Sequence, residues 1–212
     1  MSRCAAPGTG YGAAVREYYE ELWEALPADL EPPDFELRRD FLLRDVEPGM
    51  RVLDLGCGEG RFTLEIARAG GQVTGADVAV AALARARSRG PELDFRLVPF
   101  EGPLPFEDSA FELVWASEVI EHVADTARWL SEVRRVLTPR GVLLVTTPSH
   151  GRVRVALGGL ERFSEPLGDH LHLYTRRSLA LTLAEFGFAE LSVRAVAGPP
   201  GLRRLLLARG QR

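Results

Sequence analysis

The sequence has few cysteines and no long apolar run, so it lacks the features of a disulfide-bonded or membrane-embedded protein. The sequence has only two cysteines, Cys4 and Cys57, which are too few for a disulfide framework or a cysteine-ligated zinc site. No apolar run reaches the length of a membrane span, and residues 1–12 lack the apolar segment of a signal peptide. We therefore expect a cytoplasmic protein that does not enter a membrane.

An excess of positive charge is also missing. The formal net charge is −4, which gives no general attraction to nucleic acid or to an anionic membrane. The apolar and charged fractions, 46% and 26%, are ordinary for a soluble globular protein. A chain of 212 residues can bury one good core, so we expect a single domain over residues 1–212, a monomer or homodimer that acts on a small-molecule substrate.

Two nucleotide-binding motifs are absent as well. There is no G-x-x-x-x-G-K-[ST] run for a nucleoside triphosphate, and no Tyr-x-x-x-Lys pair for hydride transfer. What is present is Val52 to Gly60, a short apolar run followed by Gly56, Gly58 and Gly60, with a helical pattern from Arg61. This pattern predicts a strand, a tight turn and a helix, and the bare backbone of such a turn can approach a small molecule.

The spacing of the glycines argues against a dinucleotide. A dinucleotide fingerprint requires G-x-G-x-x-G, whereas this turn reads G-x-G-x-G and follows Asp54. A carboxylate beside the turn repels a pyrophosphate but suits a ligand with an ammonium group or free hydroxyls. An NAD(P)-dependent oxidoreductase is therefore a less favoured alternative.

From Met50 onward predicted strands and helices alternate, which is typical of a doubly wound α/β sheet. The predicted strands are 51–55, 72–77, 93–98, 111–116 and 140–147, and the predicted helices are 61–69, 79–88, 125–137 and 177–186. Residues 188–195 and 202–208 read as a closing hairpin, and helices over 13–26 and 35–46 precede the first strand.

Val52 to Gly60 resembles the first motif of the class I S-adenosylmethionine-dependent methyltransferases, and the resemblance extends over roughly residues 49 to 195. It implies a Rossmann-like sheet of seven strands with an antiparallel last strand, and S-adenosyl-L-methionine as cofactor. We expect an N-terminal helical cap over 1–48, a cofactor-binding core over 49–148, a substrate lid over 149–176, and the last helix and hairpin over 177–212. In the family the glycine loop holds the methionine part of the cofactor. The residues assigned to this part are Asp54, Gly56, Cys57, Gly58 and Gly60.

Asp77 ends the second predicted strand. Ligands of open parallel sheets lie outside the carboxyl ends of the strands, where a carboxylate can accept hydrogen bonds from both ribose hydroxyls. We therefore predict that Asp77 binds the ribose, with capping of the following helix as the alternative role. Val78 would pack on the adenine. Where related methyltransferases have an Asp for the adenine amino group, this chain has Phe100 and then Glu101, so either Glu101 accepts from the base or Phe100 stacks on it.

Ser117 to Val123 is the predicted site of the chemistry, because Ser117 ends the fourth strand and should face the sulfonium. If one helical turn follows, Glu118, Glu121 and His122 share a face. Such a set can bind a divalent cation or act as acid and base, and a surface turn is the plain alternative.

The E-x-x-E-H pattern resembles those of the ubiquinone-pathway O-methyltransferases and of the small-RNA 3′-end 2′-O-methyltransferases. In both groups these residues are associated with a divalent metal, and in the RNA enzymes a downstream His joins them. The corresponding residue here is His170. The resemblance thus implies a site of Glu118, Glu121, His122 and His170 for Mg²⁺, Mn²⁺ or Zn²⁺. Many small-molecule methyltransferases carry a similar histidine without an inferable metal, and then His122 or His170 would be a general base or an orienting group.

These observations predict a methyltransferase that acts on an oxygen, or with less support a nitrogen, of a small molecule. The catalytic candidates are His122, His170 and Glu118. A metal-dependent 2′-O-methyltransferase of an RNA 3′ end is one alternative, which the negative net charge disfavours. A cofactor-binding protein without activity of its own is another.

Overall fold

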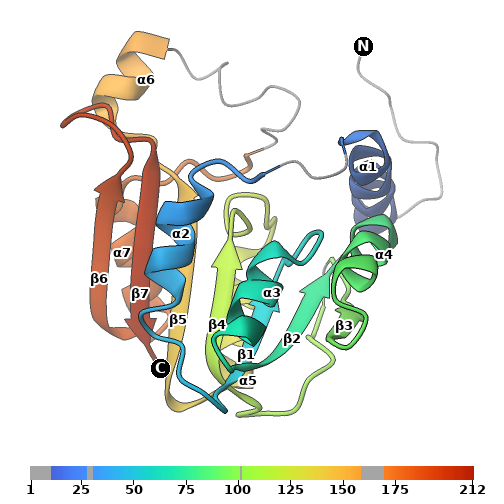
Figure 1. Cartoon of the computed structure of the whole chain (residues 1–212). Helices are drawn as coiled ribbons and strands as arrows, with labels where there is room; N and C mark the ends of the chain where they lie inside the picture. The colour runs from blue at the N-terminus through green and yellow to red at the C-terminus, as the bar shows by residue number, and fades with distance from the viewer. Residues whose placement is uncertain (1–10, 28–30, 101, 159–169) are drawn as a thin grey trace.

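The computed structural model describes residues 11–27, 31–100, 102–158 and 170–212. Its strands are β1 (Arg51–Leu55), β2 (Gln72–Asp77), β3 (Asp94–Leu97), β4 (Phe111–Ser117), β5 (Leu137–Pro148), β6 (Ala189–Val196) and β7 (Leu205–Gln211). Its helices are α1 (Tyr11–Ala25), α2 (Phe35–Leu42), α3 (Arg61–Arg68), α4 (Val80–Arg89), α5 (Thr126–Val136), α6 (Arg152–Gly158) and α7 (Arg176–Glu185). Strands and helices alternate through the middle of the chain, as the sequence pattern predicted (Figure 1).

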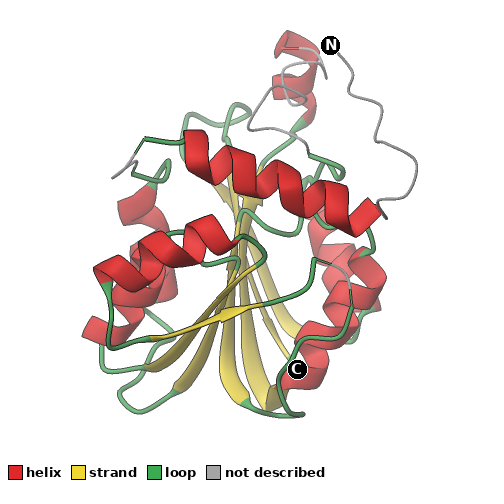
Figure 2. Ribbon diagram, turned by 90° about the vertical axis from the view of Figure 1, so that its right-hand side faces the viewer, coloured by secondary structure: helices red, strands yellow, loops and turns green. Residues whose placement is uncertain are grey.

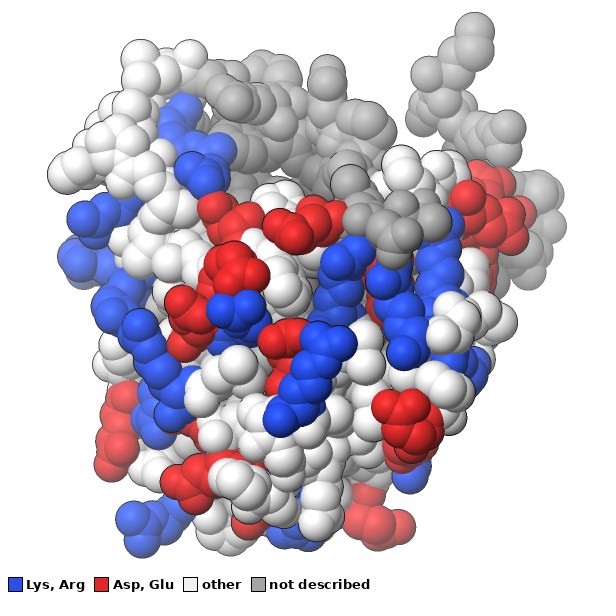
Figure 3. All heavy atoms as spheres, viewed as in Figure 1, with Lys and Arg blue, Asp and Glu red and all other residues white. Residues whose placement is uncertain are grey.

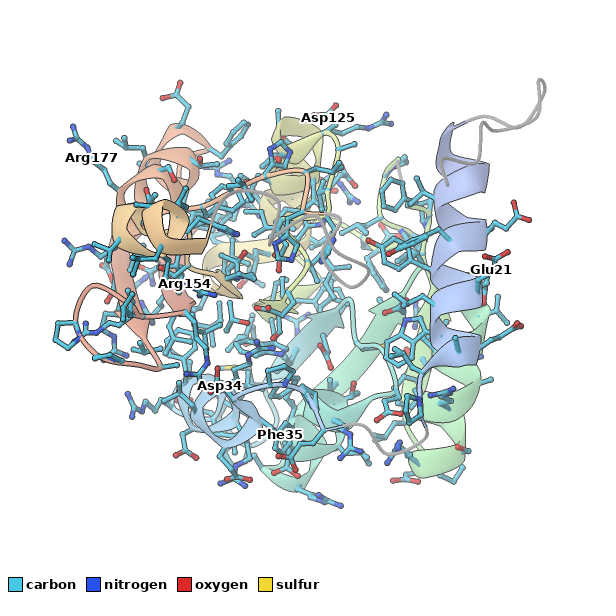
Figure 4. All side chains as sticks on the ribbon, turned by 90° about the horizontal axis from the view of Figure 1, so that it is seen from above. Glu21, Asp34, Phe35, Asp125, Arg154 and Arg177 are labelled. Carbon is cyan, nitrogen blue, oxygen red and sulfur yellow. The ribbon has the colours of Figure 1, made fainter. Side chains whose placement is uncertain are left out.

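The strands form one sheet in the order β3-β2-β1-β4-β5-β7-β6. β1 to β5 pair in parallel, and β7 inserts antiparallel between β5 and β6. The predicted seven-stranded Rossmann-like sheet with an antiparallel last strand is therefore confirmed. Because β1, β2 and β4 run in the same direction, their carboxyl ends meet at one edge of the sheet, which is the edge seen from above in Figure 4.

Helices cover both faces of the sheet (Figure 2). The apolar stripes of α5 and α7 pack on one face, where Leu130, Val133 and Leu179 are fully buried. On the other face α2 and α3 pack around Trp115, which Phe41 and Phe62 approach at ring-centroid distances of 6.3 and 5.2 Å. Trp115 is fully buried, so its role is in the core.

Some predicted boundaries differ from the structure. The second helix ends at Leu42 rather than at 46, because the Asp45 amide bonds to the Leu42 carbonyl in a tight turn. β5 begins at Leu137 directly after α5, earlier than the predicted 140. The strands of the hairpin end at Val196 and Gln211. α6 was not predicted as a helix; it lies within the expected lid, whose residues 159–169 lie outside the described part of the chain.

Within the described residues, no helix combines the length and apolarity needed to cross a membrane.

Candidate active site

The glycine turn between β1 and α3 has a backbone that other residues would strain. Gly56, Gly58 and Gly60 all have positive φ, at 78°, 53° and 80°. A Cβ on Gly56 would lie 2.3 Å from Val119 Cγ2, and one on Gly58 would lie 2.8 Å from the Trp23 ring. Both the conformation and the close packing therefore require glycine, and the turn offers bare backbone to a ligand.

This turn forms one wall of a cavity of about 470 Å³ at the carboxyl edge of the sheet. The predicted cofactor residues that line the cavity are Gly56, Cys57, Gly58, Asp77, Val78, Phe100 and Ser117. Two others do not line it. Asp54 lies beneath the turn, where its Oδ2 accepts a 2.6 Å hydrogen bond from the Thr63 hydroxyl, and Gly60 precedes α3 against Phe95. Both residues thus support the shape of the turn.

Burial sets the ionisation of Asp54. The side chain is 1% exposed, and loss of hydration raises the pKa of its carboxyl to about 7, against the lowering effect of the Thr63 hydrogen bond. The nearby Asp77 carboxylate raises it further. A neutral or partly neutral Asp54 beneath the turn removes a negative charge from next to Asp77.

Asp77 is placed at the end of β2 by contacts from two directions. Its Oδ2 accepts from the Gly58 amide at 2.8 Å, and its Oδ1 accepts from the Ala79 amide at 3.0 Å. Burial raises its pKa, and these amide bonds oppose that rise. A carboxylate oxygen can accept more than one hydrogen bond, so both oxygens retain capacity for the hydroxyls of a ribose.

The amino end of α4 is capped by a residue of another helix. Ala79 precedes α4 without a side-chain cap, and the Glu20 carboxylate of α1 accepts from the Val80 and Ala81 amides at 2.6 and 2.8 Å. The alternative role of Asp77 as the cap of this helix is thereby limited to the single Ala79 contact.

Aromatic rings enclose the cavity from above. Tyr19 and Trp23 of α1 line it, and the Tyr19 ring lies 6.3 Å from Phe100 and 6.4 Å from His122. The Arg85 guanidinium lies 5.9 Å from the Trp23 ring and donates to the Leu26 carbonyl at 2.8 Å. Side chains of α1 thus form a roof over this part of the cavity. Glu101 lies outside the described residues.

A buried arginine, not predicted from the sequence, faces the end of β4. Arg38 of α2 is 3% exposed and lines the cavity. Its Nη2 lies 3.3 Å from Glu118 Oε2, and its Nη1 donates to Ser117 Oγ at 3.5 Å. Its Nε has no hydrogen-bond partner among the described residues. A buried guanidinium with donors to spare is suited to an anionic group of a ligand.

The stretch after Ser117 is a turn and not the helical turn considered above. Glu118 has a φ of 56°, which interrupts a right-handed helix. Burial raises the pKa of Glu118, while Arg38 lowers it. Because Glu118 is directed to Arg38, it lies outside the group of possible metal ligands formed by Glu121, His122 and His170, whose ligand atoms all lie within 4.8 Å of one another.

Glu121 is fully buried, and only one of its two carboxyl oxygens has a hydrogen-bond partner among the described residues. Oε2 accepts from the Thr147 hydroxyl at 2.9 Å, whereas Oε1 has no hydrogen-bond partner in the described part of the chain. Burial first, and then the Glu118 carboxylate, raise the pKa of Glu121 well above its usual value. Nearby, burial and the neighbouring His122 and His150 lower the pKa of His170 to about 4, so this imidazole is neutral at pH 7.

Segment 170–174 brings His170 to this group. The His172 amide donates to the Glu121 carbonyl at 3.0 Å, and His172 Nε2 lies 2.9 Å from the Val123 carbonyl oxygen. On the other side the His150 amide donates to the Tyr174 carbonyl at 2.8 Å. The His170 ring consequently lies 5.1 Å from His122 and 5.6 Å from His150. A carboxylate oxygen and imidazole nitrogens form a donor set that a divalent cation can use.

Comparison with known proteins shows which proteins the chain resembles. A family model described as a methyltransferase domain matches residues 53–145. A probable S-adenosylmethionine-dependent methyltransferase of Mycolicibacterium smegmatis is 42% identical over 101 residues, which are 48% of this chain and 39% of the relative. A ubiquinone biosynthesis O-methyltransferase of Dinoroseobacter shibae is 31% identical over 154 residues, covering 65% of this chain and 60% of the relative. The chain thus spans about half the length of these curated relatives.

The fold has counterparts among solved structures. An S-adenosylmethionine-dependent methyltransferase from Mesorhizobium loti superposes with a TM-score of 0.67 at 22% identity, covering 84% of this chain and 97% of that one. The matched model spans the glycine turn, Asp77 and the end of β4, each of which contributes to the lining of the cavity. Residues 53–145 of the chain thus match a methyltransferase domain, and the relatives and the structural counterpart that it resembles are named as S-adenosylmethionine-dependent or ubiquinone-pathway methyltransferases.

Proposed function

We propose that this protein transfers a methyl group from S-adenosylmethionine to a hydroxyl oxygen of a small molecule. The observation that carries the proposal is the cavity itself: Asp77 and the glycine turn lie in its wall, and so does His122, which lies beside Glu121 and His170. A site for a ribose and a possible proton acceptor thus share one chamber. The relative from Dinoroseobacter shibae, named an O-methyltransferase, supports oxygen over nitrogen.

In this proposal, named residues of the chain bind each part of the cofactor. Asp77 accepts from the ribose hydroxyls, Val78 and Phe100 enclose the adenine, and Arg38 binds the carboxylate of the methionine part. Arg38 supports that role because it is buried next to Ser117 with its Nε unpartnered among the described residues. The cofactor supplies a methyl group bonded to a sulfonium sulfur, which an oxygen can attack in line with the leaving sulfur. The roof formed by Tyr19 and Trp23 excludes water from this step.

The remaining task is to take the proton from the acceptor hydroxyl. His122 lines the cavity, so its imidazole nitrogen is the proposed proton acceptor, with His170 behind it. Glu118, a further catalytic candidate, instead orients Arg38 in this proposal, since the two side chains are 3.3 Å apart.

A divalent cation fits the group formed by Glu121, His122 and His170. The Glu121 Oε1 and His170 Nδ1 atoms are buried and lack hydrogen-bond partners among the described residues, which is costly unless a ligand satisfies them. Two imidazoles and one carboxylate suit Zn²⁺ or Mn²⁺ better than Mg²⁺, which prefers oxygen ligands. A cation held there would lower the pKa of a hydroxyl that binds to it.

An acceptor panel tests the proposed reaction. The purified protein is incubated with S-adenosylmethionine and with phenols, catechols, aliphatic alcohols and matched amines, and S-adenosylhomocysteine and methylated products are measured by mass spectrometry. We expect methyl ethers from one hydroxyl class, and a loss of about 100-fold or more in kcat for His122→Ala. Exclusive methylation of amines would contradict the proposal.

Metal titration separates the two possible ligand sets. We expect Glu121→Gln and His170→Ala to weaken Zn²⁺ or Mn²⁺ binding by at least about 10-fold, and Glu118→Gln to leave it within about twofold, because Glu118 pairs with Arg38. Equal losses in all three variants would favour the set of four that includes Glu118. An absence of saturable binding in the wild type would refute the metal and leave His122 as a metal-free base.

A further inference from the structure

A second hollow, of about 340 Å³, lies beside β6 and has no part in the site described above. Three arginines line it: Arg176 at the start of α7, Arg194 on β6 and Arg203 in the turn before β7. The rest of its lining is Ala195 to Gly198, and no carboxylate lines it among the described residues. In the view from above, Arg177, the neighbour of Arg176 in the chain, lies at the opposite side of the molecule from α1 (Figure 4).

The positive charges around this hollow lie where the local electric field is unfavourable to them. α7 begins with Arg176 and Arg177, and its first turn contains no acidic residue. The amino end of a helix carries a partial positive charge, so cations there destabilise it by several tenths of a kcal/mol each. Arg194 and Arg203 line the same hollow and add like-charge repulsion. All three arginines are exposed, so solvent screens their repulsion and folding tolerates them. Folding nevertheless gains nothing from gathering them, whereas binding of an anion does.

The contrast with nearby arginines supports this argument. Arg204 pairs with Asp34, and Arg209 pairs with Asp45 at 2.8 Å. Arg203, directly before Arg204, instead donates to the Ala195 carbonyl at 2.8 Å, which holds its guanidinium at the hollow. Arg176 and Arg194 make no ion pair with any described carboxylate. Arginines are visible along the β6 and β7 side of the molecule, at the left of Figure 3.

The chemistry of the lining selects the class of ligand. All 26 basic residues of this chain are arginines, and it contains no lysine. The planar guanidinium binds phosphate oxygens in a bidentate manner. One arginine suffices to neutralise a carboxylate, whereas three suit the higher charge of a phosphate or diphosphate. The volume of the hollow leaves room for either group.

The hollow lies at the same edge of the sheet as the cofactor cavity. β7 is antiparallel to both β5 and β6, so β6 runs parallel to β5 and its end at Val196 lies at the carboxyl edge. His170 and Arg176 are close in the chain, so their Cα atoms lie at most about 20 Å apart. We propose that this hollow binds a phosphate or diphosphate group of the methyl acceptor, at a distance from the oxygen that is methylated. The assignment of the phosphate to the acceptor rests on the proposed function, while anion binding by the hollow does not.

Calorimetric titration of the full chain with inorganic pyrophosphate tests the site. Arg194→Gln and Arg203→Gln are compared with Arg177→Gln, a matched control because Arg177 is exposed on the same helix but does not line the hollow. We expect saturable binding to the wild type, a loss of about 10-fold or more in each of the two hollow variants, and a change below about twofold in the control. Binding of S-adenosylhomocysteine should be unchanged in all three variants.

Two results would overturn the site: no saturable binding of pyrophosphate to the wild type, or an equal loss in Arg177→Gln, which would indicate a diffuse charge effect. Failure to bind S-adenosylhomocysteine with retained pyrophosphate binding would refute the proposed function and support the hollow as an anion site. An RNA 3′-end oligonucleotide that displaces pyrophosphate with higher affinity, and needs Arg194 to do so, would overturn a small-molecule acceptor as the source of the phosphate.

Discussion

At the scale of single residues, the cofactor cavity depends on groups that are buried and only partly satisfied. Asp77 is 7% exposed, and each of its oxygens accepts one backbone amide. Arg38 is 3% exposed and has a loose contact with Glu118 at 3.3 Å. Such groups lose hydration on folding and regain partners when a ligand binds. Hydrogen bonds to a bound ligand would thus offset the desolvation energy that these groups cost in the free protein.

Replacement of Asp77 should affect cofactor affinity directly. In Asp77→Asn the amide nitrogen cannot accept a hydrogen bond, so either the Gly58 amide or a ribose hydroxyl loses its acceptor. We expect the Kd for S-adenosylhomocysteine to rise by about 10- to 100-fold, measured by calorimetry. Asp94→Asn, an exposed change on β3, is the control. An unchanged Kd in Asp77→Asn would remove Asp77 from the ribose site.

At the scale of elements, α1 is joined to the cofactor core by a few specific contacts. The Glu20 carboxylate caps α4, Trp23 packs on Gly58, and Arg85 donates to the Leu26 carbonyl. These contacts hold the roof over the cavity. We expect a cofactor bound beneath this roof to leave more easily when α1 moves, so weaker contacts should raise the dissociation rate.

The role of Glu20 as the cap of α4 can be tested by comparing substitutions of Glu20 and of the adjacent Glu21. Glu20→Ala removes the acceptor for two α4 amides, which costs about 1 kcal/mol, and should loosen α1. We expect S-adenosylhomocysteine to dissociate about 5- to 10-fold faster from this variant in stopped-flow measurements of tryptophan fluorescence, since Trp23 and Trp129 line the cavity. Glu21→Ala is the matched control, because Glu21 is exposed and points away from the core in Figure 4. Equal rates in the two variants would contradict a roof held by Glu20.

At the scale of the whole molecule, buried carboxyls govern how stability depends on pH. The pKa of Asp54 is about 7 in the folded protein, because burial disfavours its charged form, and it is near 3.9 in an unfolded chain. Between these values the folded state binds more protons than the unfolded state. The free energy of unfolding therefore falls as pH rises from about 4 to 7, by up to about 4 kcal/mol from this group alone.

Asp54→Asn should remove this part of the pH dependence. The asparagine keeps an oxygen to accept from the Thr63 hydroxyl but has no charge to bury. Urea unfolding of the cofactor-free protein should show the wild type losing about 2–3 kcal/mol more than the variant between pH 5 and pH 8. Parallel pH profiles for the two proteins would show that Asp54 stays charged in the folded protein. Other contacts of the turn would then offset the free-energy cost of burying that charge.

The sequence by itself determined the sheet, the glycine turn and the position of Asp77, because these depend on local signals. Alternating apolar runs, three glycines and a carboxylate at a strand end are all readable along the chain. The same local reading predicted a helical turn at Glu118, which a positive φ prevents.

Only the tertiary structure decided which distant residues meet. Arg38 faces Glu118 across 80 positions of the chain, and the roof residues reach Gly58 from α1. The family resemblance pointed to His170, but its position beside Glu121 and His122 follows from the hydrogen bonds on both sides of segment 170–174. Long-range contacts of this kind follow from side-chain packing between distant elements, which no local pattern encodes. For the same reason the three arginines of the second hollow, which come from a helix, a strand and a turn, have no common signature in the sequence.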